Sequence, residues 1–167
     1  MRNTMILMLL ILLLTGCGTQ TAPVETSPPT EETALQIANP WVNYDTLAEA
    51  EAASGLTFPL QETVAGSYIA ESFRVMNGQL LEVVYRDDDF EVTVRMEAGE
   101  GQDLSGVYET FEKEVTFEEE TYTITHKYTV NGGVLQLISK NGYSYSFYAP
   151  ILYWGDSAAD FLAFLNE

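Results

Sequence analysis

Polar and apolar residues alternate along much of the chain between residues 67 and 149. Residues 90–97 place apolar side chains at even positions and polar ones at odd positions, and residues 122–130 repeat the pattern with His126 among the even positions. This period of two is typical of antiparallel strands with one face against a core and one in water. Asn-Gly turn signals at Asn77-Gly78 and Asn141-Gly142 separate alternating runs, because a type I′ turn needs positive φ at both central residues.

We therefore predict about seven strands joined as a meander, over residues 67–76, 79–86, 90–97, 107–117, 121–130, 134–140 and 143–149. A helix is predicted over residues 47–53, because Thr46 is a good N-cap, Glu49 completes a capping box and Gly55 ends the run. A second helix is predicted over residues 157–166, where apolar residues recur at helical spacing. The predicted fold class is α+β: a curved antiparallel sheet of meandering strands, with a short N-terminal and a C-terminal helix packed on one face.

The first seventeen residues have the pattern of an export and lipidation signal. Arg2 precedes the uninterrupted apolar run 5–14, which as a helix would rise about 15 Å, roughly half the hydrocarbon thickness of a bilayer. Residues 1–16 are therefore predicted to be a signal peptide. The ending Leu14-Thr15-Gly16-Cys17 resembles the lipobox of bacterial lipoproteins, which implies that the Cys17 sulfur receives a diacylglycerol. A buried free cysteine after an apolar helix is the alternative.

Acylation at Cys17 would anchor the protein to the extracytoplasmic side of the cell membrane. The membrane is therefore a predicted partner, through the diacylglycerol anchor. Residues 17–38 are rich in Pro, Thr and Glu and contain no aromatic residue, so we predict a disordered tether. Residues 39–167 are then expected to form one β-rich globular domain.

The net charge of the chain limits the classes of partner that it is expected to bind. The chain has 25 acidic and 7 basic side chains, and its formal net charge is −18. This balance excludes a nucleic-acid partner, because binding to phosphates depends on Lys and Arg, and it favours attraction to cations or basic peptides. One cysteine and one histidine provide neither a disulfide nor a zinc cluster, so no cofactor and no metal is expected.

His126 is the candidate general base near neutral pH, and burial in its strand face would lower its pKa. The alternative is a core histidine hydrogen-bonded to a backbone carbonyl or a tyrosine hydroxyl. Ser144 and Ser146 are expected to point outward without a base, so no catalytic residue is predicted and an enzyme is the least favoured class. The acidic runs 87–89 and 118–120 lack calcium-loop spacing and are expected to be solvated turns.

Segments 39–55, 77–85 and 141–147 combine helix caps, Asn-Gly turns and aromatic strand positions. Together they resemble an uncharacterised domain of lipoproteins of Gram-positive bacteria, which also occurs in the extracytoplasmic part of anti-sigma-factor-like membrane proteins. The resemblance spans about residues 39–167, and it brings no established catalytic residue with it. More distantly, a curved sheet with a helix in its concavity is similar to the lipid-carrier and lipoprotein-sorting folds of the cell envelope.

Tyr153 and Trp154 follow a proline in a predicted loop, where an exposed aromatic pair would form the lip of a binding site. Packing of this pair against the sheet is the alternative. Together with His126 they are the candidate ligand-binding residues. The sequence predicts a noncatalytic binding or sensing module whose partner is an envelope protein or peptide. The alternative function is an envelope carrier that holds a lipid or other apolar ligand between sheet and helix.

Overall fold

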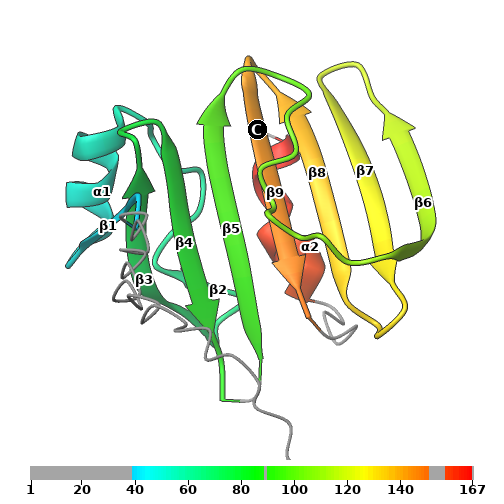
Figure 1. Ribbon diagram of the computed structural model, residues 1–167, viewed down its shortest axis with the longest axis horizontal. Coiled ribbons are helices and arrows are strands. Elements are labelled where there is room, and N and C mark those ends of the chain that lie inside the picture. The colour runs from blue at the N-terminus through cyan, green and yellow to red at the C-terminus, as the bar shows by residue number, and fades with distance from the viewer. Residues whose placement is uncertain (1–38, 89, 151–156, 167) are drawn as a thin grey trace, which may run out of the picture. The chain divides into compact units, whose positions relative to one another are not determined.

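Nine antiparallel strands form one open sheet in the computed structural model, which describes residues 39–88, 90–150 and 157–166 (Figure 1). The strand order is β1-β3-β4-β5-β9-β8-β7-β6, and β2 pairs with the start of β3. The strands are β1 (Trp41–Tyr44), β2 (Thr63–Val64), β3 (Tyr68–Met76), β4 (Leu80–Arg86), β5 (Glu91–Ala98), β6 (Phe111–Glu118), β7 (Tyr122–Thr129), β8 (Val134–Lys140) and β9 (Tyr143–Ala149). The predicted signal peptide, Cys17 and the predicted tether lie outside the described residues.

The prediction of a mainly antiparallel sheet is confirmed, but the predicted number of strands is too small. Strands β3 to β9 correspond to the seven alternating runs, and the largest difference is the start of β6 at Phe111 instead of residue 107. β1 and β2 were missed because they have four and two residues, which is too short for alternation to be recognised.

The strands do not form a single meander. β3, β4 and β5 follow one another, as do β6, β7, β8 and β9, but β5 pairs with β9 and β6 lies at the far edge of the sheet. Residues 99–110 connect β5 to β6 by crossing one face of the sheet, in front of β9 in Figure 1. Hairpin signals report only local turns, so they do not reveal this long crossing.

The first helix, α1 (Leu47–Ser54), has Thr46 as its N-cap and Gly55 at its end, as predicted, but Glu49 bonds back to the N–H of Asp45 and not to that of the N-cap. The Glu49 N–H donates to Thr46 Oγ1 at 3.3 Å, and the Glu49 carboxylate accepts from the Asp45 N–H at 3.2 Å. Gly55 ends the helix with φ 70°, in the left-handed region that glycine adopts without strain. The helix packs against β1, β3 and β4, near one edge of the sheet rather than across its centre.

The C-terminal helix is shorter than predicted, because the run from 157 divides into α2 (Ser157–Phe161) and the 3₁₀ helix η1 (Ala163–Asn166). α2 lies behind the sheet near β9 and β8 in Figure 1. The two segments bury Phe161, Phe164 and Leu165. Phe161 and Leu165 belong to the predicted apolar spacing, but Phe164 does not, and one continuous helix does not carry these residues.

The core lies on the face of the sheet that carries Val83, Val94 and Phe147, here called the inner face. The Phe161 ring meets the rings of Tyr68 and Tyr85 edge-on, each at 5.3 Å between centroids. Such aromatic contacts fill the space between the C-terminal segment and the centre of the sheet.

Lys140 on β8 also contacts the C-terminal segment. Its ammonium group is buried and donates to the Phe164 carbonyl oxygen at 2.6 Å. The Phe164 ring packs against Tyr145 with 5.0 Å between centroids. A carbonyl at a helix end is a favourable partner for a cation, so Lys140 ties η1 to β8.

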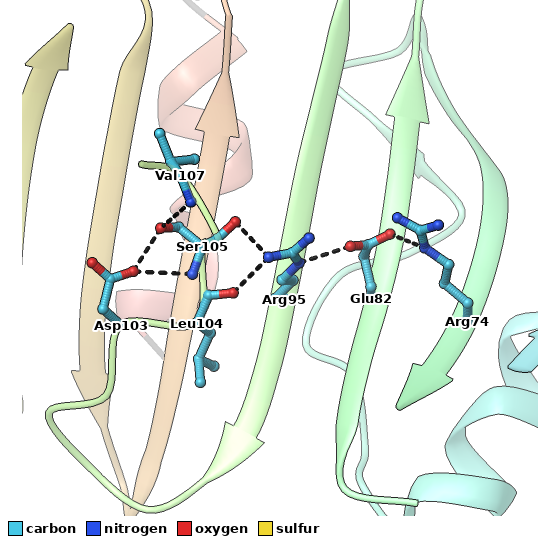
Figure 2. A network of polar contacts seen from close by, with 7 residues as sticks. All are labelled: Arg74, Glu82, Arg95, Asp103, Leu104, Ser105 and Val107. Atoms are coloured by element: carbon cyan, nitrogen blue, oxygen red, sulfur yellow. Dashed lines mark hydrogen bonds and ion pairs between the residues drawn. The ribbon is translucent and has the colours of Figure 1, made fainter. Parts of the chain in front are cut away.

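The opposite, outer face carries a buried polar network (Figure 2). The Glu82 carboxylate is fully buried and accepts from the side chains of Arg74 and Arg95, the latter at 2.7 Å. Arg95 Nη1 also donates to the carbonyl oxygens of Leu104 and Ser105. The network therefore joins three strands to the crossing segment 99–110 and holds that segment against the sheet.

Candidate functional site

An open groove of about 400 Å³ lies on the inner face, between the β6–β7 hairpin and the C-terminal helices. We call it the helix–hairpin groove. On the hairpin side it is lined by Phe117, Glu119, Tyr122, Ile124 and His126, and on the helix side by Ala159, Leu162, Leu165 and Asn166.

The side chains of the hairpin wall lie on one face of the sheet because strand residues alternate between its two faces. Phe117 pairs with Ile124, and Val115 pairs with His126, so all four side chains share the inner face. β6 is the last strand of the sheet within the described residues. As a result Phe117 remains 51% exposed, whereas Ile124 on the next strand is buried. Phe117 and Ile124 form the apolar part of this wall, and Phe117 leaves it accessible from one side.

His126 is one of the polar groups of the groove wall, with Glu119 and Tyr122. Its ring Nδ1 lies 3.3 Å from Gln136 Nε2, and the Phe117 ring meets the imidazole edge-on at 5.6 Å between centroids. Burial lowers the pKa of His126 below its ordinary value, as predicted, so the ring is neutral at pH 7. Its partner is a side-chain amide, not the backbone carbonyl or tyrosine hydroxyl considered from the sequence.

Gln136, the hydrogen-bond partner of His126, lies on the neighbouring strand β8 and is buried. Its side chain is 4% exposed, and its Oε1 has no hydrogen-bond partner among the described residues. With Gln136 Nε2 as the donor, His126 Nδ1 accepts and the imidazole proton resides on Nε2. The imidazole then offers an N–H donor, which joins Glu119, Tyr122 and Asn166 among the polar groups that line the groove and can orient a ligand.

The serines considered from the sequence lie away from this histidine. Ser144 and Ser146 lie on the outer face, as expected, but they are buried and not exposed, because residues 99–110 cover them. Ser144 Oγ donates to the Gly99 carbonyl at 2.7 Å and accepts from the Gln102 N–H at 3.0 Å. The sheet separates both hydroxyls from the imidazole, so this arrangement provides no serine–histidine pair.

The acidic turns were expected to be solvated. Asp88, Glu118, Glu119 and Glu120 are exposed, whereas Asp87 is half-buried and accepts from Ser67 Oγ at 3.1 Å. Asp89 lies outside the described residues. No group of three or more histidine, cysteine or carboxylate side chains is placed to hold a metal ion within ranges 39–88, 90–150 and 157–166.

Of the ligand-binding residues predicted from the sequence, His126 lies in the groove, whereas Tyr153 and Trp154 fall outside the described residues, as does Cys17. Sequence reasoning missed Phe117 and Leu162 as opposite walls of one site. Their inward positions were detectable from strand and helix periodicity, but their proximity depends on how the C-terminal segment packs on the sheet.

None of the helices in the described part of the chain is both long enough and apolar enough to cross a membrane. Neither a family model, nor a curated protein, nor a solved structure matches the chain. The groove is therefore assigned on its geometry and chemistry.

Proposed function

We propose that this protein is a noncatalytic binding module, anchored by lipid to the extracytoplasmic side of the cell membrane, that holds an apolar part of its ligand in the helix–hairpin groove. The observation that carries the proposal is the apolar wall left accessible at Phe117. The resemblance to an uncharacterised envelope domain is consistent with this role and belongs to the proposal.

The anchor rests on the sequence of the first seventeen residues. An acylated Cys17 would keep the globular part within tether length of the bilayer, at the surface where envelope partners are concentrated. Replacement of Cys17 by serine should release the protein from the membrane pellet and abolish incorporation of labelled palmitate. A Cys17→Ser protein that pellets as firmly as the unaltered one would contradict the anchor.

The groove suits a side chain or a short apolar segment. Its volume of about 400 Å³ lies at the lower end of the range for small-molecule sites. Deeper between helix and sheet, the rings of Tyr85, Phe161 and Phe164 already fill the core. We therefore favour contact with an exposed group of a partner over enclosure of a whole lipid.

A carrier of an apolar ligand is the second candidate, because the groove lies between sheet and helix as that function requires. Native mass spectrometry of the lipidated protein separates the two. A co-purifying lipid in addition to the covalent anchor would support the carrier, and its loss in a Leu162→Glu variant would locate the lipid in the groove.

Photo-crosslinking in intact cells tests the binding module. The photoreactive residue p-benzoylphenylalanine replaces Phe117 in one protein and Val42 in a control, because these two side chains have nearly equal exposure, 51% and 54%. Val42 lies on β1, at the opposite edge of the sheet. Discrete adducts from position 117 and none from position 42 are expected. Identical adducts from both positions would reject the groove as a binding site.

A further inference from the structure

The sheet ends at one side in a long strand whose outer edge is unpaired within the described residues. β6 has eight residues, whereas β1, at the other edge, has four. Proteins usually shorten or cover sheet edges, because an open edge presents backbone N–H and C=O groups that pair readily with another strand. β6 therefore has the length that pairing with a further segment requires.

The hairpin geometry determines which backbone groups of β6 point outward. The Glu119 N–H donates to the Tyr122 carbonyl at 2.9 Å, which closes the β6–β7 hairpin with a hydrogen-bonded pair. Counting back along the ladder, every second residue turns its backbone groups away from β7. These residues are Glu114, Thr116 and Glu118.

A side-chain contact supports this assignment. Thr116 and Thr125 are paired, and their hydroxyl oxygens lie 2.9 Å apart. Side chains approach most closely at pairs that exchange no backbone hydrogen bonds. The Thr116 backbone N–H and C=O therefore face the free edge.

The two faces of β6 differ in chemistry. Val115 and Phe117 lie on the inner face, beside the helix–hairpin groove, and Phe117 is half-exposed. Glu114 and Glu118 lie on the outer face. A strand added along this edge would place its side chains alternately against these apolar and acidic neighbours.

The charge around β6 has one dominant sign. Residues 109–120 contain six glutamates and one lysine, Lys113. Glu114 Oε2 lies 3.8 Å from Lys127 Nζ. In the described ranges no ion pair joins a cation to the other glutamates of the hairpin, Glu112, Glu118, Glu119 and Glu120. Two copies of β6 would repel each other at such an edge, so the charge disfavours self-pairing and favours a basic strand.

We propose that β6 is a docking edge for an extended basic segment of an envelope protein, which adds to the sheet as an antiparallel strand. This proposal rests on the binding-module function and names its class of partner. The segment places basic residues opposite Glu118 and Glu114, apolar residues opposite Phe117 and Val115, and a polar residue opposite Thr116. Backbone pairing supplies affinity, and the alternation of side chains supplies specificity.

A synthetic peptide, Gly-Lys-Leu-Thr-Val-Lys-Gly, has this pattern in antiparallel register. Its binding to the lipidated full-length protein in detergent micelles is measured by fluorescence anisotropy. An N-methyl group on the threonine removes the N–H that faces β6 and should weaken binding about tenfold or more. The same group on the leucine points away from β6 and should change affinity less than about twofold. Exchange of both lysines for glutamate should abolish binding.

A protein variant tests the charge contribution. Glu118→Lys replaces an attraction by a repulsion and should weaken binding of the peptide about fivefold. Asp88→Lys is the control, because Asp88 is an exposed acid in the β4–β5 turn and the charge change is the same. This control should bind as the unaltered protein does.

The outcomes separate this proposal from the binding-module function. Equal affinity of the parent and N-methyl-threonine peptides overturns strand addition, because an attraction of charge alone would then explain binding. A parent peptide that fails to bind while position 117 still gives adducts in cells also overturns strand addition, and the binding module survives. Failure of both the peptide and the adducts overturns both proposals.

Discussion

Replacement of Glu82 by glutamine should destabilise the domain strongly, because it removes the negative charge between two arginines. The Glu82 side chain is fully buried, whereas the side chains of Arg74 and Arg95 are 34% and 17% exposed. Glutamine has nearly the same size, so the perturbation is one of charge and hydrogen bonding. Its amide N–H₂ would also point a donor at a guanidinium that offers only donors.

The contacts that both arginines keep limit the loss of stability expected from Glu82→Gln. Removal of one partner from a buried ion pair costs about 3–5 kcal/mol. Arg95 retains the carbonyl oxygens of Leu104 and Ser105, and both arginines retain some solvent. The Trp41 ring also remains over both guanidinium groups, at 4.7 and 5.5 Å from its centroid. We therefore expect the lower end, about 3 kcal/mol, which corresponds to a decrease in Tm of about 10 °C for a domain of this size.

Urea denaturation followed by circular dichroism measures the change. Glu91→Gln is the matched control, because Glu91 pairs with Arg86 in an exposed ion pair whose side chains are 43% and 51% accessible. An exposed pair contributes about 1 kcal/mol or less. If Glu82→Gln costs no more than Glu91→Gln, the buried carboxylate does not hold this network and the reasoning is refuted.

Three further predictions concern separate parts of the domain. Lys140→Met removes the buried bond to the Phe164 carbonyl and should cost about 1–2 kcal/mol, with faster amide hydrogen exchange in η1; unchanged exchange there would contradict the anchoring role. Burial lowers the pKa of His126 from 6.5, so between that value and the lowered folded pKa the unfolded chain binds more protons. Stability should therefore be complete above pH 6.5 and fall as the pH decreases through that window; urea curves of His126→Gln should lack this component. Thr46→Ala removes the oxygen that accepts from the Glu49 N–H and should cost about 1 kcal/mol, whereas an unaltered midpoint would show that the cap is dispensable.

Local structure was predictable wherever neighbours in sequence determine it. Asn77 and Asn141 adopt φ of 55° and 54°, and the glycines that follow them are also positive, as the predicted hairpin turns require. The capping of α1 by Thr46 depends on residues three positions apart. Alternation identified the inner face of β5 and β7 for the same reason, because side chains on a strand point to opposite sides in turn.

Long-range pairing was not predictable in this way. In the sequence Glu82 is a single polar residue within an apolar run, and Ser144 was predicted to point outward. Both are buried in the structure. Ser144 is covered because β5 pairs with β9 and the segment 99–110 then crosses the outer face. Glu82 is covered by Arg74 and Arg95 from the neighbouring strands β3 and β5. The same pairing leaves β6 at an edge and places its half-exposed Phe117 across from Leu162.

The amino-acid sequence by itself determined seven of the nine strands in the described residues, the inward faces of β5 and β7, the turns and the first helix, because periodicity, caps and positive φ act over a few residues. Only the tertiary structure decided which strands meet, which polar residues are buried and where the helix–hairpin groove opens. Those properties depend on contacts between segments far apart in the chain, where many pairings satisfy the same local pattern and the packing of the whole domain selects one.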